Sequence, residues 1–113
     1  MMEAKAITKY LRISPRKVRR VAELVRGKNT EEAISILHFT RKNASEHIEK
    51  TVRSAVANIM QAKPGADTHS LFVKEIFVDG GPMLKRGRAG SMGRRSMIRR
   101  RTAHITVVVA EKA

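Results

Sequence analysis

The feature that most constrains this chain is a basic run near its C-terminal end. Residues 85–101, KRGRAGSMGRRSMIRRR, contain eight Lys or Arg and no acid, and no Asp or Glu occurs between Asp79 and Glu111. Two runs rich in Val, Ile and Phe flank it, LFVKEIFVD at 71–79 and RTAHITVVVA at 101–110. Like charges held between two strands repel one another unless an anion neutralises them. Nucleic-acid phosphate is therefore the first candidate partner.

The rest of the chain has the composition of one small folded domain. A length of 113 residues favours a single domain, and the 42% of apolar residues fall in periodic runs that can form a core. The net charge of +14 makes the body basic as well. With three Phe, one Tyr and no Trp, base stacking on aromatic platforms is not expected to be the main binding mode.

Several classes of function lack their sequence signals. The chain has no Cys, so disulfides and thiolate metal sites are excluded. Its four His are not paired at metal-binding spacing, no serine lies in a nucleophile motif, and no glycine pattern opens a phosphate-binding helix. No secretory signal is visible, and no apolar run approaches the ~20 residues that span a bilayer. We therefore expect a soluble intracellular protein without enzymatic activity, metal or cofactor.

The N-terminal third predicts a strand followed by a helix. Residues 3–11 alternate loosely between small or apolar and basic side chains, which is typical of a short strand. Ser14-Pro15 is a good helix start, with Ser as the N-cap and Pro in the first turn. Gly27 is the expected C-terminal stop. The apolar face of this helix is predicted to be Val18, Val21, Ala22 and Val25.

Two further helices are expected. Thr30 can cap the second helix. Glu31 and Glu32 follow in its first turn, where the helix dipole favours acids. The third is the longest periodic segment, from about Asn43 to Ala62, and Pro64-Gly65 ends it. Its apolar positions, spaced three and four apart, are Ala44, Ile48, Val52, Ala55, Val56 and Ile59.

The last part of the chain predicts two strands joined through the basic run. Residues 71–79 and 102–110 are separated by too few residues for a helical crossover, so antiparallel pairing is expected. If the strands continue through the basic run they form one long hairpin, with its turn near Gly87, Gly90 and Gly93. A two-stranded ribbon has no core of its own and is marginal in water, so a partner must hold it.

Three stretches resemble a known family. They are RISPRKVRRVAELVRGK at 12–28, IFVDGGPMLKR at 76–86 and GRRSMIRRRTAHITVVVAEK at 93–112. Together they are similar to the bacterial-type large-subunit ribosomal protein twenty-two family, and the last stretch is the most specific. The chain departs from the usual family pattern at Gly80 and at Ala89-Gly90.

The resemblance implies a single ribosomal-protein domain over 1–113, of α+β class. Three helices would pack on a small three-stranded antiparallel sheet, with a long basic hairpin protruding over about 80–102. The implied function is structural: the chain would bind large-subunit (23S) rRNA during assembly, and its hairpin would line the nascent-peptide exit tunnel. The implied partners are this rRNA, neighbouring large-subunit ribosomal proteins, and the nascent peptide and macrolides near the hairpin. The implied location is a cytoplasmic ribosome, with an organellar one as the alternative.

Basic residues in the first helix and in the arm are the candidate contacts to rRNA. Five cations cluster in and just before the first helix, with Glu23 as the one acid near them: Arg12, Arg16, Lys17, Arg19 and Arg20. The alternative interpretation is that they form a charged face that contacts only solvent. The predicted rRNA-binding residues are Arg12, Ser14, Arg16, Lys17, Arg19, Arg20, Lys85, Arg86, Arg88, Arg94, Arg95, Arg99, Arg100, Arg101, Thr102 and His104. The predicted hairpin tip is Gly87, Arg88, Ala89, Gly90, Ser91, Met92 and Gly93.

An architectural DNA-binding protein is the alternative function. Such proteins clasp the minor groove with β-ribbon arms and often insert a wedge, commonly Pro, at the tip. No Pro follows Pro82 in this chain, and no dimer seam is evident. Both observations favour RNA over DNA.

Overall fold

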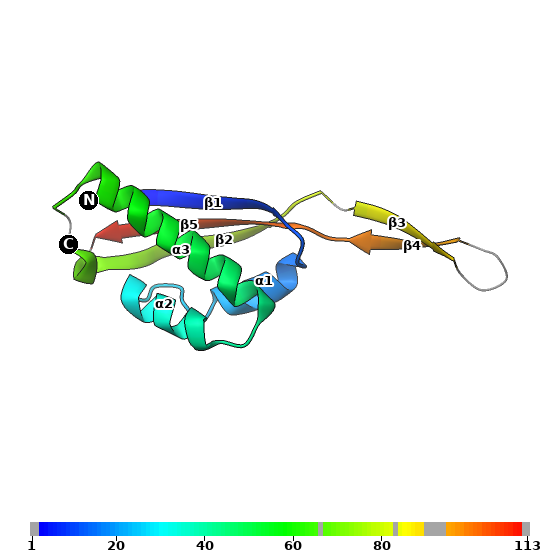
Figure 1. Cartoon of the computed structure of the whole chain (residues 1–113), viewed down its shortest axis with the longest axis horizontal. Coiled ribbons are helices and arrows are strands. Elements are labelled where there is room, and N and C mark those ends of the chain that lie inside the picture. Colours follow the sequence, from blue (N-terminus) through cyan, green and yellow to red (C-terminus); the bar gives the residue numbers. More distant parts are fainter. Residues whose placement is uncertain (1–2, 66, 83, 90–94, 112–113) are drawn as a thin grey trace.

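Helices cover one face of a three-stranded sheet, and a separate two-stranded hairpin extends from one end (Figure 1). The computed structural model describes residues 3–65, 67–82, 84–89 and 95–111. In chain order the elements are β1 (Glu3–Leu11), α1 (Pro15–Ala22), α2 (Thr30–Phe39), α3 (Asn43–Ala62), the short 3-10 turn η1 (Thr68–Ser70), β2 (Leu71–Gly80), β3 (Leu84–Ala89), β4 (Arg95–Arg100) and β5 (Ala103–Glu111). For β3 and β4 the description covers the backbone. The expected α+β class is confirmed.

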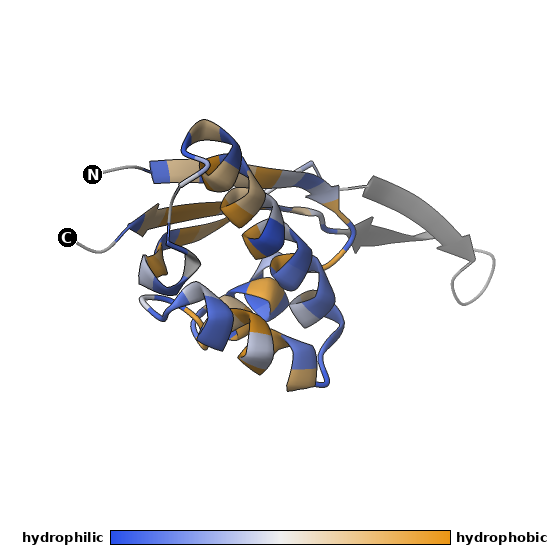
Figure 2. Cartoon of the chain, turned by 60° about the vertical axis from the view of Figure 1, so that its left-hand side comes forward, coloured by the Kyte–Doolittle hydropathy of each residue, from blue (hydrophilic) through white to orange (hydrophobic). Residues whose placement is uncertain are grey.

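The sheet has the order β1-β5-β2, and both pairings are antiparallel. The last strand of the chain is therefore the middle strand. Its alternate residues Ala103, Ile105, Val107 and Val109 are fully buried under the helices. Figure 2 shows β5 as apolar along most of its length. The outer strands each carry an irregularity, between Thr8 and Leu11 in β1 and between Val73 and Glu75 in β2.

Helix α3 lies over β1 and β5 and supplies more of the core than either of the other helices. It spans the predicted residues, and Ile48, Val52 and Ile59 are fully buried. Val56, predicted to be a core residue, is only half-buried at the edge of the cluster. Hydrogen bonds also attach the helix to β1: Thr8 Oγ1 lies 2.7 Å from Thr51 Oγ1.

Helix α1 ends earlier than predicted. It stops at Ala22, and the backbone continues to Lys28 in tighter turns, although Val25 is fully buried as expected. The reason is a contact with β2. The Gly27 N–H donates to the Val73 carbonyl at 3.0 Å, and the Val73 N–H donates to the Lys28 carbonyl at 2.9 Å. Gly27 has φ +79°, which glycine adopts without strain.

The predicted N-cap of α1 is confirmed in position, whereas the predicted cap of α2 is wrong. Ser14 occupies the N-cap position of α1, but its hydroxyl makes no capping bond. The cap of α2 is Asn29, whose Oδ1 accepts from the Glu31 N–H at 3.0 Å, and Thr30 is the first helical residue. Asn29 also donates to the His69 carbonyl at 2.8 Å. The prediction chose the wrong one of two adjacent residues that can both cap.

The hairpin forms its own two-stranded ladder. β3 and β4 pair antiparallel from Leu84 opposite Arg100 to Ala89 opposite Arg95. Gly87 lies within β3, opposite Met97, and not in the turn. The expected turn glycines 90 and 93 lie outside the described residues. The molecule extends 65 × 25 × 16 Å. Its radius of gyration of 17.2 Å exceeds the value of about 13 Å for a compact chain of this length.

A short neck, residues 81–82 and 101–102, interrupts the strands between sheet and hairpin, so β2 and β5 do not continue unbroken into the ribbon. The Gly81 N–H donates to the Thr102 carbonyl at 2.9 Å, and the Thr102 hydroxyl donates to the Pro82 carbonyl at 2.6 Å. Thr102 is buried. Any β-carbon at position 81 would lie 2.5 Å from Thr102 Oγ1, so only glycine fits here without displacing Thr102.

Ion pairs join the opposite end of the sheet. Lys74 on β2 binds Glu3 on β1, and this hydrogen bond raises the pKa of the Lys74 ammonium above its ordinary value. Lys63, after α3, lies 3.1 Å from the carboxylate of Glu111. No helix in the described part of the chain is long and apolar enough to cross a membrane.

Candidate nucleic-acid interface

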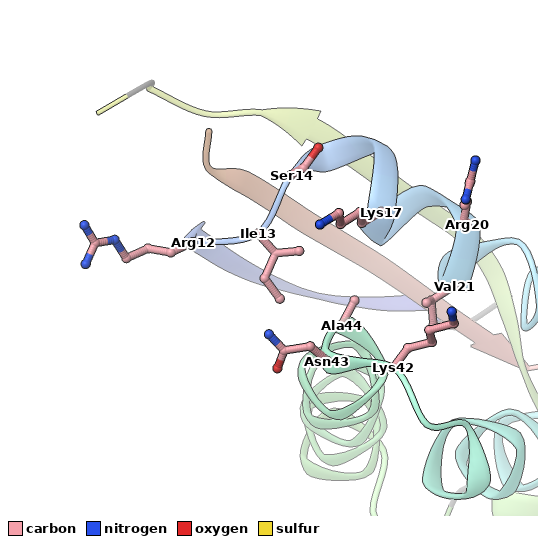
Figure 3. A pocket seen from close by; sticks show the side chains of 9 residues that line it. All are labelled: Arg12, Ile13, Ser14, Lys17, Arg20, Val21, Lys42, Asn43 and Ala44. Atoms are coloured by element: carbon pink, nitrogen blue, oxygen red, sulfur yellow. The ribbon is translucent and has the colours of Figure 1, made fainter. Parts of the chain in front are cut away.

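The starts of α1 and α3 lie side by side and enclose a pocket of about 450 Å³ (Figure 3). We call it the basic pocket. It is lined by Arg12, Ile13, Ser14, Lys17, Arg20, Val21, Lys42, Asn43 and Ala44. Four of these nine residues are cationic and none is acidic. Such a surface attracts anions because nothing in its lining neutralises the positive charge.

The basic pocket brings together four of the predicted rRNA-binding residues, Arg12, Ser14, Lys17 and Arg20. Figure 3 shows Lys17 on the side of α1 that faces α3, and Arg12 extended away from the helices. Arg16 is exposed on α1 but is not part of the lining. The predicted face of α1 is therefore divided between this pocket and open solvent.

Lys42 and Asn43 complete the pocket, and sequence reasoning did not identify them. They lie at the start of α3, where Lys42 occupies the N-cap position. Ser, Thr, Asp and Asn are preferred there, and a cation is unfavourable beside the positive end of the helix dipole. The sequence signal that could have identified Lys42 is its place directly before the longest periodic segment, at the expected start of a helix.

Arg19 has a structural contact, unlike its neighbour Arg20. Its Nε and Nη2 both donate to the Val78 carbonyl on β2, at 3.0 and 2.9 Å. Arg26 Nη2 donates to the Ile76 carbonyl on the same strand at 2.9 Å. β2 is an edge strand, and these guanidinium groups donate to its backbone carbonyls.

Thr102 and His104, predicted from the resemblance to contact rRNA, are packed at the neck. The Thr102 hydroxyl is bound to Pro82, and His104 Nδ1 accepts the Tyr10 N–H at 3.0 Å. His104 is half-buried, whereas Arg101 is exposed. Both side chains are therefore engaged within the protein where the hairpin leaves the body.

Tyr10 is an exposed aromatic residue that the sequence analysis did not select. It has φ +59°, within the irregular segment of β1. Its ring lies edge-on to His104, with centroids 5.0 Å apart, and 64% of the residue is exposed. Left-handed backbone is uncommon in a residue with a bulky side chain, and local contacts must hold it.

The remaining predicted residues belong to the hairpin. The backbone register places Lys85 directly opposite Arg99. Like charges at directly opposed positions destabilise a two-stranded ladder. An anion bound along the ribbon would remove this repulsion. Arg86, Arg88, Arg95 and Arg100 lie on the two strands. The predicted tip residues Gly90, Ser91, Met92 and Gly93, with Arg94, lie outside the described residues.

Within the described ranges, no group of three or more His, Asp or Glu is placed to hold a metal ion. The chemistry available at the interface is that of cations and helix ends. These groups bind phosphate.

Comparison with known proteins matches nearly the whole chain. A family model described as ribosomal protein L22p/L17e matches residues 6–110. The large ribosomal subunit protein uL22 of Desulfitobacterium hafniense (strain DSM 10664 / DCB-2) is 56% identical over 112 residues, covering 99% of this chain and 97% of that protein. The uL22 of Leptospira biflexa serovar Patoc (strain Patoc 1 / ATCC 23582 / Paris) is 57% identical over 111 residues, covering 98% and 95%. That of Syntrophobacter fumaroxidans is 52% identical over 111 residues, covering 98% and 100%.

Proposed function

Because the chain belongs to the ribosomal protein L22p/L17e family and is a structural constituent of the large ribosomal subunit, we propose that it binds large-subunit rRNA during assembly and that its hairpin lines the nascent-peptide exit tunnel. The family is one of ribosomal structural proteins and not of enzymes. The proposed partners are 23S-type rRNA and the ribosomal proteins beside it, with the nascent peptide and macrolides at the hairpin. The proposed location is a cytoplasmic ribosome.

The observation that carries the proposal is the hairpin. β3 and β4 pair only with each other, and residues 85–101 carry eight cations without an acid. An isolated ribbon is marginal in water, and the pairing of Lys85 with Arg99 weakens this one further. Folded RNA supplies phosphates on several sides of a narrow arm, which supports rRNA as the partner.

The body would act as the anchor and the tip as the tunnel element. Arg99, Arg100 and Arg101 lie where the ribbon meets the neck, so phosphate contacts there would fix the direction of the arm. The tip is the part farthest along the chain from the neck. The resemblance assigns this part to the tunnel wall.

A paired experiment tests this division. Replacing Arg99, Arg100 and Arg101 together with Ala is expected to weaken rRNA binding and to impair large-subunit assembly, which sucrose-gradient profiles measure. Deleting Ala89–Ser91 is expected to leave assembly intact and to change macrolide sensitivity or stalling on arrest peptides. A tip deletion that blocks assembly, together with a base variant that assembles normally, would refute the proposed roles.

Salt dependence tests the phosphate contacts. If ~6–10 phosphates are neutralised, affinity for rRNA should fall by about 10³–10⁵ between 50 and 200 mM salt. Filter binding with the full chain measures this directly, and a flat response would contradict the proposal. Competition with duplex DNA at matched salt distinguishes the architectural alternative, because only an RNA reader depends on A-form shape and 2′-hydroxyls.

A further inference from the structure

The four cations of the basic pocket are left without partners within the described residues. No hydrogen bond or ion pair to a side-chain atom of Arg12, Lys17, Arg20 or Lys42 occurs there, and no carboxylate lines the pocket. Elsewhere on the body, cations are often paired. Lys50, for example, lies 3.2 Å from Glu46 on the same helix. Figure 3 shows the Arg12 and Arg20 side chains pointing away from the space between α1 and α3. Lys17 and Lys42 are therefore the cations left to meet a ligand there, and a bound anion would relieve the repulsion between them.

Both helices that meet at the pocket also lack side-chain caps. The Ser14 hydroxyl makes no capping bond at α1, and Lys42 makes none at α3. The first N–H groups of a helix have no partner inside it, and Lys42 adds a cation to the positive end of the α3 dipole. Lysine is an unfavourable choice at the N-cap of α3, and an unfavourable local choice is typical of a functional site, where a ligand supplies the compensation. A phosphate group would do so at α3.

The pocket is larger than a phosphate requires. Its volume of about 450 Å³ lies within the range of about 300–1,000 Å³ for sites that hold small organic ligands. Ile13, Val21 and Ala44 add apolar surface to its lining. A cationic rim with a partly apolar lining matches the two parts of a nucleotide, its phosphate and its base.

We infer that the basic pocket holds a single unpaired nucleotide of the rRNA, turned out of its stack, with its phosphate beside Lys17, Lys42 and the start of α3. This inference rests on the proposed function, since it specifies how the body would bind rRNA. A duplex cannot enter a pocket between two helices. The nucleotide therefore comes from a loop, a bulge or a junction, where RNA bases are free to be read.

Binding to a transcript of large-subunit rRNA tests the inference with the full chain. Lys17→Ala/Lys42→Ala removes two charges from the pocket. Lys28→Ala/Lys50→Ala removes two charges from exposed pairs with glutamates on helix surfaces, and serves as the control. The pocket variant is expected to bind at least about tenfold more weakly than the control at equal salt, because charge-assisted contacts are lost.

Chemical probing identifies the nucleotide itself. A reagent specific for unpaired bases should show one nucleotide of the transcript protected in complexes with the wild-type chain and with the control variant. When the pocket variant is added at a concentration that saturates the transcript, that nucleotide should react as it does in free RNA. RNA made abasic at that position should bind the wild-type chain several-fold more weakly. Circular dichroism checks that the variants are folded, and Lys17→Gln, which removes the charge but keeps a long polar side chain, is a second pocket variant.

The outcomes are separable. If the wild-type chain does not bind the transcript, the proposed function fails. If it binds but the pocket variants match the control, the pocket is not part of the interface and the inference fails. If the pocket variants weaken binding while no base is protected, or the abasic RNA binds normally, the pocket takes a backbone phosphate alone and the nucleotide assignment is wrong.

Discussion

Replacing Gly81 with Ala tests how tightly the neck is packed. The added β-carbon would lie 2.5 Å from Thr102 Oγ1 and 3.1 and 3.2 Å from Cε1 and Nε2 of His104. Thr102 cannot move away freely, because its hydroxyl is bound to Pro82 at 2.6 Å. His104 is held in turn by the Tyr10 N–H.

The expected loss combines two opposing effects. Overpacking a filled site costs about 1–3 kcal/mol, whereas Gly→Ala restricts the unfolded chain and stabilises by about 0.4–1 kcal/mol. The net loss in free energy of unfolding is then about 1–2 kcal/mol. With an unfolding entropy of about 2.1 cal/mol/K per residue, this lowers Tm by roughly 4–8 °C.

The neighbouring glycine provides the matched control. A β-carbon at Gly80 meets nothing within 4 Å, so Gly80→Ala should leave Tm unchanged or raise it slightly. Thermal melts followed by circular dichroism compare the two variants. In a Thr102→Ala background the cost of Gly81→Ala should shrink, because the nearest clash is gone. Equal Tm values for the two single variants would refute this account of the neck.

Three further predictions concern the body. Val52→Asp is expected to abolish the cooperative thermal transition because it buries an unpaired charge. Val56→Asp, at a half-buried position, should only lower Tm. Thermal melts that rank the two variants in the opposite order would contradict the assigned buried face of α3. Arg19→Ala should lower the free energy of unfolding, measured in urea, by about 1–2 kcal/mol because the Val78 carbonyl loses two donors. Arg16→Ala should change it by no more than about 0.5 kcal/mol. Equal urea midpoints for the two variants would disprove the stabilising contact between Arg19 and Val78. Deleting 85–100 and joining the ends by a short turn should preserve a cooperative transition, since β3 and β4 pair only with each other, and losing the transition would place the arm within the fold.

Elements with a clear apolar period were predictable from the sequence. The predicted third helix and first strand have the bounds of α3 and β1, and the other two sheet strands differ from β2 and β5 by one residue at most at each end. An element that buries one face repeats apolar residues at its own period, so the signal is local.

The end of α1 was not predictable in this way. Val25 continues the helical spacing, yet the backbone leaves the helix at Ala22 because Gly27 and Lys28 bond to Val73. That partner lies on a strand far along the chain. Local propensity cannot reveal a competition between helical bonds and bonds to a distant edge strand.

Within the candidate site, the sequence selected Arg12, Lys17 and Arg20 of the four pocket cations, but not the environment of each. Arg19 and Arg20 are adjacent and chemically identical, but one contacts β2 and the other lines the basic pocket. Lys42 was not selected, because its place depends on how the start of α3 packs beside α1. Which charges remain free for a ligand is decided by tertiary packing, and this information is absent from any local pattern.

The position of β5 has a consequence for the order in which the molecule is made. β5 is the last strand along the chain and the middle strand of the sheet, paired with β1 on one side and β2 on the other. During synthesis from the N-terminus, β1, α1 and α3 emerge without the central strand that they contact, and the basic arm emerges before that strand as well. The core therefore closes in one late step, through contacts between opposite ends of the chain, which are slow to form. Until then the nascent chain exposes apolar surface beside uncompensated positive charge, a state in which premature contact with other chains competes with folding.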